Sequence, residues 1–97
     1  MAKVVIHLVG SLRAALGGPS LEVEMKPGIA FKEMIRLAAQ QTGKDLWSFI
    51  SDPETGEIHP SIMIFVDHEN LRHLQGWDTP LAGGNEITIL KADMAGG

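Results

Sequence analysis

The sequence predicts a single α+β domain, in which one mixed sheet of four to five strands has one helix packed across it. The chain has 97 residues, which is the length of one domain. Short runs with strand periodicity outnumber segments with helical periodicity, and only one long segment carries an apolar helical stripe. The simplest two-layer arrangement lays that stripe on one face of a single sheet.

Two strands are expected in the first quarter of the chain. Residues 4–9 (VVIHLV) are short and β-branched, with an apolar face on one side and His7 on the other. Residues 21–25 (LEVEM) alternate between apolar and acidic side chains, which is typical of a strand with one face in water. The turn signal at residues 17–19 (GGP) separates them, so we expect the two strands to pair antiparallel.

The main helix is expected to begin near Phe31 and to stop at Gly43. Its apolar residues recur at the spacing of one helix face: Phe31, Met34, Ile35 and Ala38. A further helical turn is expected where three more apolar residues fit the same spacing: Leu46, Phe49 and Ile50.

Two further strands are expected in the second half. Residues 62–66 (IMIFV) are apolar at every position. The face that carries Met63 and Phe65 is therefore either a second core face or an apolar surface for a partner, and Phe65 is the candidate partner-binding residue. Residues 67–70 predict a turn, and residues 86–90 predict the last strand.

The composition excludes several classes of function. The net charge is −4, and the lysines and arginines are scattered singly, so nucleic acid is not an expected partner. The absence of cysteine excludes disulfides, thiolate metal sites and a cysteine nucleophile. No apolar run reaches the roughly 18 residues of a membrane span, and the N-terminal segment lacks the cleavage region of a signal peptide. We therefore expect a cytoplasmic protein without a membrane partner.

The polar residues do not predict an enzyme or a metal site. His59, His68 and His73 fall in or near loops, at spacings that match no zinc motif. The acidic turn at residues 52–57 (DPETGE) lacks the glycine position and the closing glutamate of a calcium loop. No nucleophile or pocket motif accompanies the carboxylates. We expect a carrier or binding protein that is not itself an enzyme.

The last seven residues have no expected packing partner and end on Gly96 and Gly97. They divide the chain into a folded domain, residues 1–90, and a flexible C-terminal tail, residues 91–97. At about 3.3 Å per residue the tail extends about 23 Å from Leu90, which is enough to enter another protein's active site. Glycines fit a narrow channel because they lack Cβ. An ionised α-carboxylate is a poor electrophile, so it must first be activated, for example as an acyl-adenylate, by a partner that uses ATP and magnesium.

The sequence resembles the ubiquitin-like sulfur-carrier family, the MoaD/ThiS group, which includes the small subunit of molybdopterin synthase. The resemblance covers nearly the whole chain and rests on the order of five segments: Leu12-Arg13, residues 52–57 (DPETGE), 78–81 (DTPL), 84–87 (GNEI) and 95–97 (AGG). It implies a β-grasp fold, which agrees with the ββα-β-β order read from the residues.

The resemblance also implies a mechanism and partners. An E1-like enzyme adenylates the terminal glycine with ATP, a donor replaces AMP with sulfur, and the glycyl thiocarboxylate delivers the sulfur to an acceptor enzyme. Carried over to this chain, Gly97 bears the thiocarboxylate, and Gly96, Ala95 and Met94 thread the partner's channel. The carrier itself binds no cofactor, since ATP and magnesium belong to the activating partner.

Molybdopterin biosynthesis is the leading expectation, with a molybdopterin synthase large subunit as acceptor. The sequence departs from that pattern at residues 91–94 (KADM), where prolines and a valine are usual, and at Asp67-His68, where an Asn-Gly turn is usual. The loop at residues 52–57 resembles carriers that serve cysteine synthesis. The alternatives are therefore a carrier for a cysteine or thiazole synthase and a ubiquitin-like modifier joined to lysines.

Overall fold

The computed structural model describes residues 2–91, and Met1 and residues 92–97 lie outside the described part. The elements follow one another as β1 (Ala2–Val9), α1 (Ser11–Leu16), β2 (Ser20–Met25), α2 (Phe31–Thr42), α3 (Leu46–Ile50), β3 (Ile62–Val66), β4 (Glu69–Asn70), the 3-10 turns η1 (Leu71–His73) and η2 (Gly76–Asp78), and β5 (Glu86–Lys91).

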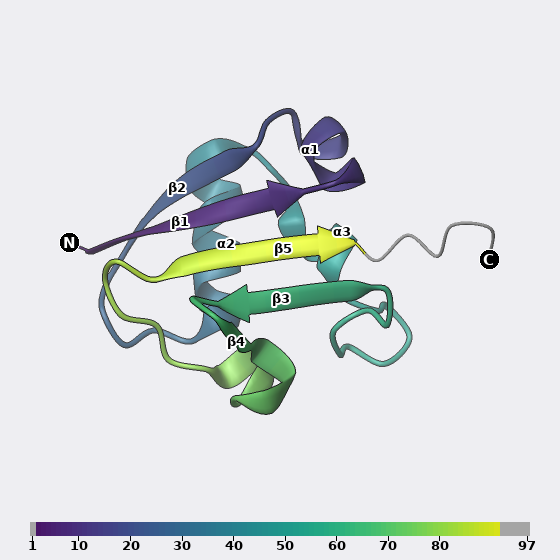
Figure 1. Cartoon of the computed structure of the whole chain (residues 1–97). Helices are drawn as coiled ribbons and strands as arrows, with labels where there is room; N and C mark the ends of the chain where they lie inside the picture. The colour runs from purple at the N-terminus through teal and green to yellow at the C-terminus, as the bar shows by residue number, and fades with distance from the viewer. Residues whose placement is uncertain (1, 92–97) are drawn as a thin grey trace.

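The strands form one five-stranded sheet in the order β2-β1-β5-β3-β4. β1 and β5 pair in parallel at the centre, and the other neighbours pair antiparallel. The predicted α+β class and the mixed sheet are thus confirmed. α2 crosses one face of the sheet and passes behind the strands in Figure 1.

One face of the sheet and one face of α2 make the core. Alternate strand residues point toward the helix and are almost completely buried: Val4, Ile6, Val23, Ile62, Ile64, Ile87 and Ile89. The predicted helical stripe meets them, with all four members buried: Phe31, Met34, Ile35 and Ala38. α2 ends where predicted, since Gly43 has a φ of 74° and its N–H donates to the carbonyl of Ala39 at 2.9 Å.

Several elements differ from the sequence prediction. β4 occupies Glu69–Asn70, within the segment predicted as a turn, and β1 and β2 begin two residues and one residue earlier than predicted. α1 was not predicted; it places Leu12 and Leu16 in the core and ends at Gly17. β5 runs one residue further than predicted and includes Lys91. In α3, Phe49 is 41% exposed although it fits the apolar spacing, because a helix of five residues buries only the face shared by its first and last positions.

Side chains hold the long connections to the domain. The Arg72 guanidinium donates to the carbonyls of Ile62 and His59, both at 2.8 Å. The Trp77 indole N–H donates to the carbonyl of Gly56 at 2.7 Å, which ties the acidic turn to η2. Across residues 2–91 no helix is long and apolar enough to cross a membrane.

Candidate partner interface

β5 connects the domain to the tail. It lies between β1 and β3 in the sheet, and its last residue, Lys91, is also the last residue of the described range. The predicted tail residues lie outside that range: Met94, Ala95, Gly96 and Gly97. Because β5 is hydrogen-bonded on both sides, the point at which the chain leaves the domain has a fixed position (Figure 1).

The face of the sheet that α2 does not cover carries two rows of side chains next to this point. The row nearest the tail is Val9, Leu90 and Met63, and the row behind it is His7, Thr88 and Phe65. In the antiparallel pairs of such rows the Cβ atoms lie about 4.5–5.5 Å apart, so the side chains share one surface.

Four of these residues form an apolar surface, which we call the outer-face patch: Val9, Met63, Phe65 and Leu90. Val9 is 43% exposed, and the other three are half-buried. Met63 and Phe65 alternate with the buried Ile62, Ile64 and Val66, so they point away from the core. The structure therefore resolves the alternative left open by the sequence, because the Phe65 side of β3 is surface and not a second core face.

The same face becomes charged away from the tail. The His7 Nε2 atom lies 2.9 Å from the Glu86 carboxylate, and the Lys3 ammonium lies 3.7 Å from Glu22. These exposed pairs contribute little to stability, but they border the apolar rows on one side. An apolar centre with a polar border is the usual arrangement of a protein–protein interface.

A second apolar surface lies on the helix side and was missed by the sequence reasoning. An apolar cavity of about 450 Å³ lies between α2 and α3, beside the 39% exposed Trp47. At its rim the Arg36 guanidinium donates to the Glu33 carboxylate, a hydrogen bond that lowers the pKa of Glu33 and raises the pKa of Arg36. Both groups are thus charged and paired with each other at neutral pH.

The loop histidines and carboxylates do not come together. Within residues 2–91 no group of three or more histidines, aspartates and glutamates is placed to hold a metal ion. His59 is half-buried, and its Nδ1 atom lies 2.8 Å from the Ser61 hydroxyl. The hydroxyl of Ser61, two positions along the chain, thus occupies one ring nitrogen of this histidine.

Known proteins resemble this chain over most of its length. The sequence model of the ThiS family matches residues 6–97. A protein of Archaeoglobus fulgidus to which a sulfur-carrier role is ascribed is 34% identical over 86 residues, which cover 89% of this chain and 93% of that protein.

Two solved structures share the fold. The small archaeal modifier protein 1 (SAMP1) of Methanosarcina acetivorans has a TM-score of 0.72 and 28% identity, over 97% of this chain and 96% of that one. A chain of the BexX/CysO complex of Amycolatopsis orientalis has a TM-score of 0.74 and 25% identity, over 92% of this chain and 94% of that one. Both likenesses cover more than nine-tenths of this chain, and not only one motif.

Proposed function

Because this chain belongs to the ThiS family of ubiquitin-like sulfur carriers, we propose that Gly97 carries sulfur as a C-terminal thiocarboxylate. A carboxylate oxygen of Gly97 attacks the α-phosphorus of ATP on an E1-like partner and displaces pyrophosphate. Sulfur at the oxidation level of sulfide, supplied as HS⁻, then attacks the acyl carbon and displaces AMP, so the thiocarboxylate forms without an oxidant or a reductant. The C–S bond so formed stores the sulfur until an acceptor enzyme takes it.

In this proposal the chain presents a reactive group and does not catalyse the reaction. ATP and magnesium bind to the activating partner, because an adenylate needs a phosphate site that residues 2–91 do not offer in any glycine-rich motif. Gly96, Ala95 and Met94 pass through the partner's channel, and the lack of Cβ at Gly96 lets the chain pass a narrow part of that channel. A cytoplasmic location agrees with the requirement for ATP.

One observation carries the proposal: the outer-face patch includes Leu90, which lies on the strand that leads directly into the tail. Leu90 belongs to the patch and is followed by Lys91, the last residue of β5. A partner that covers the patch therefore holds the chain one residue before the tail begins. At about 3.3 Å per residue the seven tail residues reach up to about 23 Å into the partner, so docking and delivery are performed by adjacent parts of the chain.

The acceptor that we propose is a molybdopterin synthase large subunit, with a cysteine synthase or a thiazole synthase as the alternatives. The domain division that we propose follows from the same argument: residues 1–90 dock, and residues 91–97 deliver. The acceptors differ in the product that receives the sulfur. Incubation of the purified thiocarboxylate form with each acceptor in turn, followed by measurement of the sulfur-bearing product, distinguishes them.

The central test changes the tail by one residue. Deletion of Gly97, or addition of one alanine after it, is expected to abolish ATP–pyrophosphate exchange with the E1-like partner. Addition of one alanine before Met1 is the matched control and should leave the exchange unchanged. Circular dichroism should show the same fold for all three variants, since Gly97 lies beyond β5. Sulfur transfer at the normal rate by either tail variant would disprove the proposal.

A second candidate function, conjugation to lysines, is favoured by the likeness to a small archaeal modifier protein at 28% identity. It shares the activation step, but a lysine amine receives the acyl group and an isopeptide bond results. Intact-mass analysis of the protein from native cells separates the two functions. An exchange of oxygen for sulfur on the free chain indicates a carrier, and covalent conjugates of higher mass indicate a modifier.

A further inference from the structure

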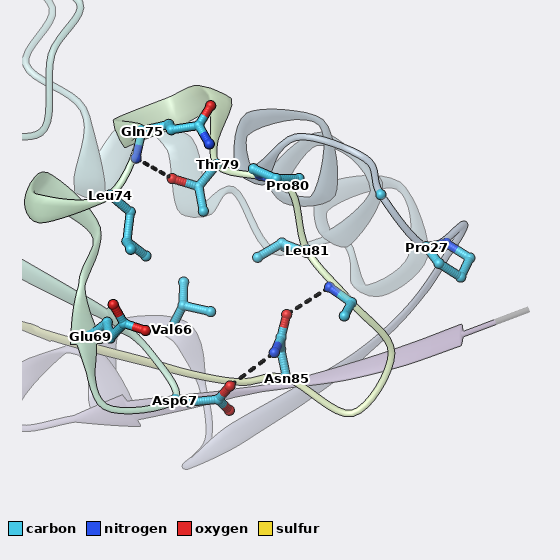
Figure 2. Close-up of a pocket in the computed structure, with 12 residues that line it drawn as sticks. Pro27, Val66, Asp67, Glu69, Leu74, Gln75, Thr79, Pro80, Leu81 and Asn85 are labelled. Atoms are coloured by element: carbon cyan, nitrogen blue, oxygen red, sulfur yellow. Dashed lines mark hydrogen bonds between the residues drawn. The ribbon is translucent and has the colours of Figure 1, made fainter.

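A second feature of the domain lies at the opposite end of β5 from the tail. A cavity of about 570 Å³ opens beside the turn between β3 and β4 (Figure 2). Asn85, which lines it, immediately precedes the first residue of β5, Glu86. With a rise of about 3.3 Å per residue, β5 places the cavity about 17 Å from Lys91. The cavity is therefore separate from the tail. It lies on the other face of β3 from the outer-face patch, because Val66 lines the cavity and the neighbouring Phe65 points the opposite way.

The floor and walls of the cavity are apolar and well supported. Val66 and Leu81 are 8% and 2% exposed, and Leu74 is half-buried beside them. Figure 2 shows these three side chains converging on the same space. The Leu81 N–H donates to the carbonyl of Ile29 at 2.9 Å, and the Gly28 N–H donates to the carbonyl of Leu81 at 2.7 Å. These bonds fix the wall, so the cavity is formed before any ligand arrives.

Asp67 and Glu69 bring two carboxylates to the rim of this cavity, and none of the twelve lining residues is a lysine, arginine or histidine. Asp67 has a φ of 56°, and its carboxylate accepts from the Glu86 N–H at 3.0 Å and from the Asn85 side-chain amide at 2.9 Å. One bond to each oxygen leaves further lone pairs free. Glu69 follows on β4, two positions along. Within the described range, neither carboxylate takes part in an ion pair.

We propose that this cavity receives an arginine side chain of a partner protein. A guanidinium is planar and weakly hydrated, so it tolerates apolar walls such as Leu81, Pro80 and Leu74 better than an ammonium does. Its forked N–H groups match carboxylate acceptors, which Asp67 and Glu69 supply at the rim. The negative rim and the absence of a cation among the lining residues give charge complementarity to this one residue type.

The position of the cavity favours a partner protein as the source of the arginine. It is open to the surface and lies away from the tail, so a protein can hold the domain there while Gly97 is in an active site. This inference goes beyond the proposed function and does not depend on the sulfur chemistry. It predicts that part of the recognition of the domain survives deletion of the tail.

The test uses three probes on the full chain labelled with ¹⁵N. The first is an acetylated and amidated Gly-Arg-Gly peptide, the second is the same peptide with citrulline, which keeps the shape without the charge, and the third is free L-arginine. We expect the arginine peptide to shift the amide signals of Asp67, Glu69 and Asn85 saturably, with a dissociation constant near 1 mM. The citrulline peptide should bind at least tenfold more weakly.

Two variants make the result specific. Glu69→Gln keeps the size of an exposed side chain and should weaken binding of the arginine peptide about fivefold. Glu54→Gln, on the acidic turn and not among the residues that line the cavity, is the matched control and should bind as the natural chain does. Equal binding of arginine and citrulline, absence of shifts around the cavity, or no effect of Glu69→Gln would each overturn the proposal. Tighter binding of free L-arginine than of the peptide would also overturn it, because it would indicate a metabolite site.

Discussion

The side chain of Gln41 makes two hydrogen bonds with the backbone of Glu24, one to its N–H and one to its carbonyl, as a neighbouring strand would. Its Oε1 atom accepts from the Glu24 N–H at 2.8 Å, and its Nε2 group donates to the Glu24 carbonyl at 2.7 Å. Glu24 lies on β2, which is an edge strand, and Gln41 comes from the last turn of α2. The helix thus covers the exposed edge of the sheet near the end of β2, where unpaired backbone groups would invite pairing with another chain.

Gln41→Ala is expected to lower the free energy of unfolding by about 1–2 kcal/mol, because two hydrogen bonds are lost and alanine replaces neither. Urea denaturation followed by circular dichroism measures the change. Gln40→Ala is the matched control, since Gln40 is the exposed neighbour on the same helix and should change stability by less than about 0.5 kcal/mol. Equal stability of the two variants would contradict a role for the pairing with Glu24.

Asp67 is expected to stabilise the turn between β3 and β4 by its side chain. Asp67→Ala loses two hydrogen bonds and keeps a side chain in the left-handed region, so the free energy of unfolding should fall by about 2 kcal/mol. Asp67→Asn keeps one carbonyl acceptor and a residue type that tolerates this backbone, so it should cost about half as much. Chemical denaturation of both variants measures the order. An alanine variant as stable as the asparagine variant would show that the bonds to Asn85 and Glu86 contribute nothing.

Most of the fold could be predicted from local patterns. The period of two in β1 and β2 and the helical period from Phe31 identify these elements, because burial against one partner requires each pattern. The end of α2 could be predicted because glycine readily adopts the left-handed backbone that ends a helix, and Gly43 has a φ of 74°. α1 gave no such signal, because its six residues hold only two buried side chains, Leu12 and Leu16, too few to show a period.

The surfaces were harder to predict than the core. An uninterrupted apolar strand such as β3 has the same sequence pattern whether its second face is covered or exposed. Only the arrangement of the sheet and the helix could therefore place Phe65 on a surface. The cavity beside Asp67 combines segments that are far apart in the sequence, from Pro27 to Asn85, and no local pattern connects them. The predicted roles of the tail residues rest on the family resemblance and remain predictions.

Trp77 is expected to hold the acidic turn in place through its indole N–H. Trp77→Phe keeps a ring beside Trp47, whose centroid lies 4.7 Å away, but removes the donor to the Gly56 carbonyl. Loss of about 1 kcal/mol should raise hydrogen exchange of the Gly56 and Asp52 amides about fivefold. Exchange of the Ile64 amide in the same sample is the internal control and should change far less. Uniform acceleration at all three amides would show a global loss of stability instead.

Phe65 is expected to contribute to partner binding without supporting the core. Phe65→Ser should raise the KM for this chain in ATP–pyrophosphate exchange at least tenfold, equivalent to about 1.4 kcal/mol of binding, because aromatic anchors dominate interfaces. The kcat should change little, since Phe65 lies on β3 in the folded domain and takes no part in the chemistry at the C-terminus. Phe49→Ser is the matched control: it removes the same ring from an exposed site on α3, on the helix side of the sheet, and should leave KM unchanged. Thermal unfolding of both variants separates binding from folding. An unchanged KM for Phe65→Ser, or an equal rise for both variants, would exclude the outer-face patch as the docking surface of the activating enzyme.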